Sequence, residues 1–171
     1  MIDILQTFCR LFTIIVFSVS FLGKVRDIRA FGNIIDRFQM LPKQMSLLAA
    51  YIFLFLEAII VAMLLVKKLN IFGFSIAVVL LIIFTIGLWN VLKSDIETSC
   101  NCFGISERKI SIYDILRNVI VIIIGIMGIL TTINSTSNDY LVSISSVIML
   151  PPSIITFIIV TNLQELQSLF K

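Results

Sequence analysis

The stretch from Leu69 to Leu92 reads LNIFGFSIAVVLLIIFTIGLWNVL and contains no charged residue. A helix of about 20 apolar residues is long enough to cross the ~30 Å hydrocarbon core of a bilayer. The composition of the whole chain is consistent with such a span, because only 13% of its residues are charged, whereas a soluble domain carries about 25%. The sequence therefore predicts an integral membrane protein.

Four more apolar stretches have the length of a membrane-spanning helix. They are Ile4–Gly23, Met45–Val66, Asp114–Ile133 and Leu141–Val160. Pro151-Pro152 interrupts the last stretch, and we expect its helix to kink or break there because proline lacks a backbone donor. The predicted fold class is an all-α integral membrane protein, with a four-helix transmembrane bundle plus a fifth, proline-interrupted transmembrane helix. We expect residues 1–171 to form a single membrane domain.

The first stretch also has the length of a secretory signal. However, no basic segment precedes it, and no small-x-small cleavage site follows Gly23. We therefore expect a retained helix.

Two connections between the predicted spans are long. The first has apolar residues at three- and four-residue steps, namely Ile28, Phe31, Ile35, Phe38 and Leu41. With charged residues between them, this spacing predicts an amphipathic helix over about residues 25–40 that lies at the membrane interface. The second long connection, residues 93–113, contains two of the three cysteines.

The sequence SCNCFG, at Ser99–Gly104, separates Cys100 from Cys102 by one residue. A disulfide between them would close a small and strained ring, and strain makes a disulfide more oxidising and more labile. The two cysteines are therefore candidate catalytic residues for thiol–disulfide exchange, and the alternative is a pair of unreactive loop thiols. A structural zinc site needs four ligands. Because the chain has no His and only one further Cys, we expect no metal site.

The third cysteine, Cys9, lies near the start of the first span, whereas Cys100 follows the far end of the third span. These two spans run parallel, so about 30 Å of membrane separates the two thiols. A disulfide needs Cα atoms within about 7 Å. We therefore expect Cys9 to be a small buried hydrophobic residue.

Glu57 is a carboxylate near the middle of the second span, where a charge is costly and usually functional. At 1.5 Å per residue, Arg10 in the first span lies at a similar depth. We therefore expect a Glu57–Arg10 ion pair. The pair would either fix the register of two helices or form a polar site for a proton, a quinone head group or the thiol relay.

Arg117 and Asn118 open the fourth span just after the cysteine-containing connection. The positive end of a helix and a nearby guanidinium both favour thiolate over thiol. The alternative for Arg117 is an interfacial side chain that extends to water.

Two arguments about membrane orientation disagree. Nine basic residues lie on the face that holds the cysteine-containing connection, against Lys67 and Lys68 on the other. The positive-inside rule thus places the cysteines in the cytoplasm. Disulfides, however, persist outside the cytoplasm. Five of the nine basic residues lie in the connection at residues 24–44, which carries the predicted interfacial helix, and this weakens the charge argument. We therefore favour an extracytoplasmic cysteine loop.

Several motifs occur together in a specific order. They are Arg10, Phe21-Leu22-Gly23-Lys24, Met40-Leu41-Pro42, Glu57, Cys100-Asn101-Cys102-Phe103-Gly104 and Asp114-Ile115-Leu116-Arg117-Asn118. Over about residues 4–133 this order resembles the MauE family of DoxX-like membrane proteins. The resemblance implies a membrane protein that works with a thioredoxin-like partner to form disulfides in an exported protein. It also implies that Cys100 and Cys102 are the redox pair, with Arg10, Lys24, Glu57, Arg117 and Asn118 as supporting polar residues.

The leading hypothesis is therefore a thiol–disulfide redox component of a bacterial cell membrane. A non-enzymatic assembly or immunity-type subunit of an export operon is the alternative, and a small transporter organised around Glu57 is a third reading. We expect the lipid bilayer, a thioredoxin-like protein and an exported client as partners. Nucleic acid is excluded, because no basic patch is interleaved with aromatic residues. No cofactor is certain from the sequence, and a quinone is a candidate electron acceptor although no residue identifies its site.

Overall fold

The computed structural model describes residues 2–38, 42, 45–93, 112–134 and 144–162, and this part of the chain is almost entirely helical. Its helices are α1 (Ile2–Arg26), α2 (Ile28–Arg37), α3 (Ser46–Leu65), the 3₁₀ turn η2 (Lys67–Leu69), α4 (Asn70–Lys93), α5 (Ile112–Asn134) and α6 (Ile144–Thr161). Four helices are long and apolar enough to cross a membrane: α1, α3, α4 together with η2, and α5. The predicted all-α integral membrane fold is confirmed.

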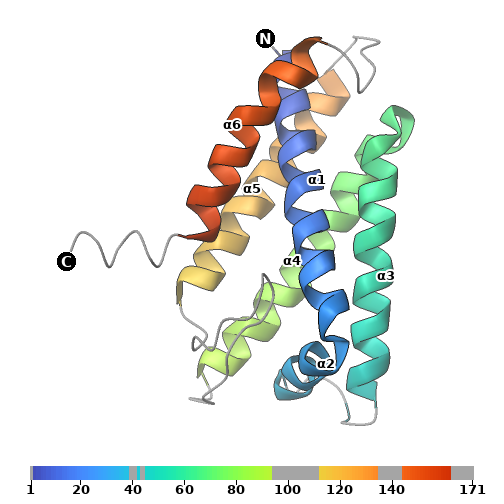
Figure 1. The fold of residues 1–171 in the computed structure, drawn as a ribbon, viewed down its shortest axis with the longest axis vertical. Helices are drawn as coiled ribbons and strands as arrows, with labels where there is room; N and C mark the ends of the chain where they lie inside the picture. Colours follow the sequence, from blue (N-terminus) through green and yellow to red (C-terminus); the bar gives the residue numbers. More distant parts are fainter. Residues whose placement is uncertain (1, 39–41, 43–44, 94–111, 135–143, 163–171) are drawn as a thin grey trace, which may run out of the picture.

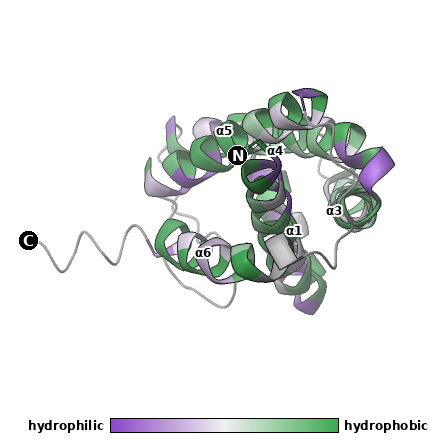
Figure 2. Cartoon of the chain, turned by 90° about the horizontal axis from the view of Figure 1, so that it is seen from above, coloured by the Kyte–Doolittle hydropathy of each residue, from purple (hydrophilic) through white to green (hydrophobic). Residues whose placement is uncertain are grey.

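Helix α1 lies at the centre of the bundle (Figures 1 and 2). It packs against α3, α5 and α6, while α4 bridges α3 and α5. In its most apolar segment 56% of the residues are buried, against 28–39% in the other three spans. Several polar side chains on α1 are accordingly enclosed by protein, among them Arg10, Ser20 and Lys24.

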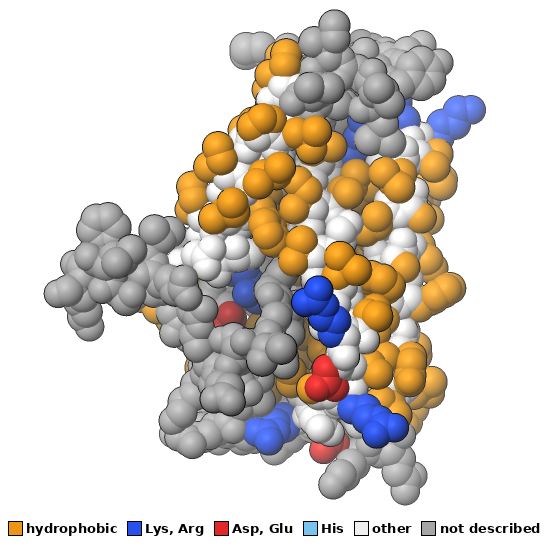
Figure 3. All heavy atoms as spheres, viewed as in Figure 1, with side chains coloured by type: hydrophobic (Ala, Val, Ile, Leu, Met, Phe, Trp, Pro, Cys, Tyr) orange, Lys and Arg blue, Asp and Glu red, His pale blue; other side chains and the backbone are white. Residues whose placement is uncertain are grey.

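The outward faces of the surrounding helices are hydrophobic. Large apolar side chains such as Phe55, Phe72 and Ile133 are more than half exposed, and Figure 3 shows such side chains covering much of one face. Most charged side chains on that face lie in its lower half, and further basic side chains lie at its upper right. Because exposed apolar patches of this extent are rare on soluble monomers, this surface is the one that contacts lipid.

The amphipathic helix predicted over residues 25–40 is α2, which spans Ile28–Arg37. Its apolar side chains Phe31, Ile34, Ile35 and Phe38 are buried against α3, α4 and the start of α5. The apolar face thus packs on protein, and a position at the membrane interface stays a prediction. Helix α1 continues to Arg26, so Lys24 lies in a helix and not in the connection.

The start of α2 depends on a side-chain cap, because Asp27 Oδ1 accepts a hydrogen bond of 2.9 Å from the Ala30 backbone N–H. We predict that Asp27→Ala lowers the free energy of unfolding by about 1 kcal/mol, the usual cost of losing an N-cap. Thermal unfolding in detergent micelles measures the change. Asp36→Ala is the control, since Asp36 lies in the last turn of α2, where removal of a negative charge is neutral or favourable. Equal losses in both variants would contradict the capping role.

Helix α6 runs without a break through Pro151 and Pro152, so the expected break is wrong. The hydroxyls of Ser153 and Thr156 donate to backbone carbonyls one turn earlier, at 2.7 and 2.8 Å. Such hydroxyls and contacts with a neighbouring helix allow prolines inside membrane helices, and α6 packs along α1. The apolar part of the described helix is shorter than the four spans.

Candidate functional site

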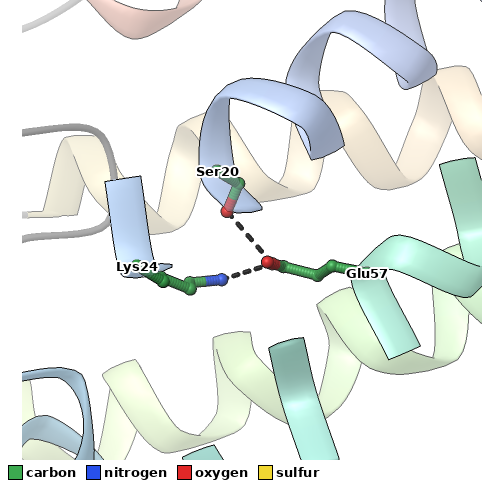
Figure 4. A network of polar contacts seen from close by, with 3 residues as sticks. All are labelled: Ser20, Lys24 and Glu57. Carbon is green, nitrogen blue, oxygen red and sulfur yellow. Dashed lines mark hydrogen bonds and ion pairs between the residues drawn. The ribbon is translucent and has the colours of Figure 1, made fainter. Parts of the chain in front are cut away.

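A buried charge pair joins α1 to α3 (Figure 4). Lys24 Nζ donates to Glu57 Oε1, and Ser20 Oγ donates to the same oxygen at 3.0 Å. The side chains of Lys24 and Glu57 are only 5% and 3% exposed. Because an isolated buried charge is very costly, the pairing lowers the free-energy cost of placing both side chains inside the bundle.

The position of the pair follows from the two helices that carry it. Ser20 and Lys24 are four residues apart, so they lie on the same face of α1. That face is turned toward α3, where Glu57 lies among hydrophobic neighbours. The Lys24 ammonium also lies over the rings of Phe31 and Phe84, with Nζ 4.8 and 5.4 Å from the ring centroids. These cation–π contacts help to stabilise a lysine that is removed from water.

The predicted Glu57–Arg10 pair is wrong, because Glu57 pairs with Lys24. Arg10 lies ten residues before Ser20 on α1, or about 15 Å along the helix axis. The predicted pair requires the start of the first span and the end of the second span to lie at the same depth in the membrane. In Figure 1, α3 extends lower than α1 because α2 folds beneath the end of α1. This stagger brings Glu57 level with the last turns of α1.

Helix α5 adds two more polar residues on the same side of the bundle. Arg117 and Asn118 are 8% and 4% exposed. Arg117 Nη1 lies 3.4 Å from Asp114 Oδ1, one turn earlier on α5. The alternative of an arginine that extends to water is therefore wrong for Arg117.

These residues meet at one partly open cavity enclosed by α1, α3, α4, α5 and α6. Its lining residues are Val16, Phe17, Ser20, Lys24, Phe53, Glu57, Leu80, Leu81, Phe84, Arg117, Asn118, Val121, Phe157, Val160 and Thr161. The centre of a water molecule can occupy about 40 Å³ of it. Since about 10–15 Å³ holds one water, there is room for about three.

Two polar atoms at the cavity have unused hydrogen-bonding capacity. Neither Glu57 Oε2 nor Asn118 Nδ2 has a hydrogen-bond partner among the described residues, although both atoms are buried. Most buried polar atoms in proteins are hydrogen-bonded, so such exceptions call for water or a ligand. The cavity is therefore the candidate functional site.

Of the five supporting polar residues taken from the sequence, Lys24, Glu57, Arg117 and Asn118 line the cavity and Arg10 does not. Sequence reasoning missed Ser20, the aromatic wall at Phe84 and the contribution of α6. The four-residue step from Ser20 to Lys24 would have revealed the first, had α1 been extended to Arg26. The apolar residues of α6 carry no such signal.

The structure describes one of the three cysteines, Cys9. Cys9 is 1% exposed in the core and is a free thiol, as predicted. Cys100 and Cys102 lie outside the described residues. The connection that carries them leaves α4 at Lys93 and enters α5 at Ile112. Both helix ends lie at the end of the bundle that contains α2 (Figure 1).

The family of the chain follows from comparison with known proteins. The family model described as "Methylamine utilisation protein MauE" matches residues 2–131. The chain belongs to the MauE family. The predicted resemblance is thereby confirmed.

A MauE relative comes from Paracoccus denitrificans, where it is named "Methylamine utilization protein MauE". It is 29% identical over 114 residues, which make up 65% of this chain and 61% of that protein. The match therefore spans about three-fifths of the relative's length. No solved structure matches this MauE chain. All the polar residues that line the cavity, except Thr161, lie within residues 2–131, the range that the family model matches.

Proposed function

We propose that this MauE-family membrane protein is a component of a thiol–disulfide redox pathway. It passes oxidising or reducing equivalents through Cys100 and Cys102 to a thioredoxin-like protein, for disulfide formation or maturation of an exported protein. The relative's name makes a protein of methylamine utilisation one candidate client. The cysteine pair acts on the extracytoplasmic side of the bacterial cell membrane, where disulfides persist.

The observation that carries the proposal is the placement of Arg117 and Asn118. They lie in the second turn of α5, directly after the connection that carries the cysteines, and they line the polar cavity. The N-terminal end of α5 and the guanidinium both favour an anionic thiolate over a neutral thiol nearby. Thiolate is the nucleophile in thiol–disulfide exchange.

The exchange needs no group beyond the two thiols and the partner's disulfide. One thiolate attacks a sulfur of the partner's disulfide and forms a mixed disulfide. The second cysteine then displaces the partner, which leaves with both of its thiols reduced. Two electrons and two protons thus pass from the membrane protein to its partner, and the reverse reaction runs when the partner has the more reducing potential.

We predict that Cys100 and Cys102 of intact cells react with a membrane-impermeant maleimide only after treatment with a reductant. The test compares labelling before and after reduction in a Cys9→Ser background, with Cys100→Ser/Cys102→Ser as the control for background labelling. Labelling only after lysis, with no need for reductant, would place free thiols in the cytoplasm. The disulfide-forming role would then be wrong.

A second readout separates the redox role from the assembly role. The double Cys→Ser variant should accumulate normally and leave the exported client without its disulfides. If the client keeps its disulfides in this variant, a non-enzymatic assembly subunit becomes the better reading. A transporter organised around Glu57 would instead show uptake in vesicles that depends on Glu57 and not on the cysteines.

A further inference from the structure

Helix α2 has two faces of opposite character. The apolar face is buried against the neighbouring helices. The other face is exposed and carries Arg29, Asn33 and Arg37. These residues follow one another at four-residue steps, so they form a stripe about 12 Å long on one side of the helix. The stripe faces outward from the bundle.

Further charged residues surround this stripe. Arg26, the last residue of α1, adds an exposed guanidinium two residues before α2 begins. Asp27 and Asp36 carry negative charge, but Asp27 already caps the start of α2 and Asp36 is half-buried. The guanidinium group of arginine presents paired N–H donors that fit two oxygens of a phosphate group. We name the four outward residues Arg26, Arg29, Asn33 and Arg37 the arginine surface.

Helix α2 lies level with residues that are typical of a membrane boundary. Its buried side chains pack in one cluster with Ala50 of α3 and with Leu88 and Val91 of α4. Tyr51 and Trp89 are sequence neighbours of these residues, and each is about half exposed. Tyrosine and tryptophan are enriched where the hydrocarbon core meets the head groups. The two rings therefore indicate that α2 lies level with the lipid head groups.

The surroundings of Arg26 favour a lipid over a water-soluble partner. Leu22 and Val25, in the last turns of α1, are at least half exposed. An arginine beside exposed apolar side chains suits the boundary between acyl chains and head groups, because its stem stays with apolar groups while its charge reaches the phosphates. An acidic protein in solution would leave Leu22 and Val25 without an apolar partner.

We propose that the arginine surface binds the phosphate groups of anionic phospholipids such as phosphatidylglycerol. The guanidinium groups of Arg26, Arg29 and Arg37 donate hydrogen bonds to phosphate oxygens, and the Asn33 amide donates to a further oxygen of the head group. The connection that carries the cysteine pair leaves α4 and enters α5 at this same end of the bundle (Figure 1). Lipid binding therefore holds that end at the depth of the head groups. The inference does not rest on the redox role of the cysteines.

Binding is tested with the full chain in nanodiscs of phosphatidylcholine, to which a phosphatidylglycerol with a photoreactive diazirine near its head group is added. We expect saturable labelling of residues 22–38 that unlabelled phosphatidylglycerol competes away and added phosphatidylcholine does not. Arg29→Gln should weaken the binding by about fivefold and Arg26→Gln/Arg29→Gln by more than about tenfold, because each basic residue near an anionic surface adds about fivefold in affinity.

Lys68→Gln is the matched control, since it removes one exposed positive charge at the opposite end of the bundle. It should leave the labelling of residues 22–38 unchanged. High salt should weaken the labelling of the unchanged protein and have little further effect on the double variant, because salt screens exposed charges. The midpoint of thermal unfolding checks that the variants remain folded.

Two results would overturn the proposed lipid site. One is equal labelling of residues 22–38 in Arg26→Gln/Arg29→Gln and in the unchanged protein. The other is competition by phosphatidylcholine that is as strong as competition by phosphatidylglycerol. Either result would leave an acidic protein as the better candidate for the partner of the arginine surface.

Discussion

Lys24→Met is expected to destabilise the protein by about 3–5 kcal/mol, the cost of leaving one member of a buried ion pair without its partner. Glu57 is 3% exposed, and within the described part of the chain only its Oε1 is hydrogen-bonded, to Lys24 and Ser20. Once Lys24 is replaced, the weaker hydroxyl of Ser20 is what remains to stabilise the carboxylate. The midpoint of thermal unfolding in detergent and the amount of protein in membranes measure the loss.

The double variant Lys24→Met/Glu57→Leu distinguishes loss of the pair from loss of lysine packing. Replacing both members of a buried pair by hydrophobic residues is often neutral or stabilising, so this variant should recover most of the lost stability. Lys68→Met, at an exposed position after α3, is the matched control and should change little. If Lys24→Met is as stable as Lys68→Met, the pair does not hold α1 against α3.

Gly128→Leu is expected to cost about 3 kcal/mol, at the upper end of what overpacking of a core usually costs. A Cβ atom at Gly128 would lie 2.5 Å from Cε1 of Phe74 on α4. Phe74 is 0% exposed in the hydrophobic core, so a displaced ring would press on other core side chains. Gly125 faces Val78 on α4 in the same way, with a Cβ distance of 2.8 Å. Small residues let membrane helices approach closely, and here they set the spacing of α4 and α5.

The same substitution should also disturb the cavity, because α5 carries Arg117 and Asn118. The midpoint of thermal unfolding in detergent measures the loss of stability in each variant. Ala58→Leu is the control, since Ala58 is exposed on α3 and a larger side chain there points to lipid. Equal stability of the two variants would show that α4 and α5 can separate at little cost.

The membrane-spanning helices were predictable because hydrocarbon imposes a simple condition on the chain. Every backbone group must be hydrogen-bonded within the membrane, so a long apolar run is forced to be a helix. The predicted span Leu69–Leu92 became α4 at Asn70–Lys93. The period of Phe31, Ile35 and Phe38 likewise indicated α2. The resemblance to the MauE family added Arg10, Lys24, Glu57, Arg117 and Asn118 as supporting polar residues, and all of them except Arg10 line the cavity.

The partner of Glu57 was not predictable in this way. Its identity depends on the stagger between α1 and α3, which depends on how α2 folds beneath α1 and on the packing of α1 against α5 and of α3 against α4. An error of a few residues in this stagger moves a carboxylate by a whole helical turn, about 5.4 Å. Arg10 and Lys24 are both buried cations on α1, and local sequence does not rank them.

The cavity is also a product of tertiary structure, since five helices contribute to its lining. Which apolar side chains of α4 and α6 face inward is decided by packing, because both helices are apolar around most of their circumference and periodicity therefore assigns them no inner face. The amino-acid sequence by itself identified a helical membrane protein with a pair of cysteines separated by one residue. Only the assembled bundle placed Lys24, rather than Arg10, against Glu57 and enclosed a polar site beside them.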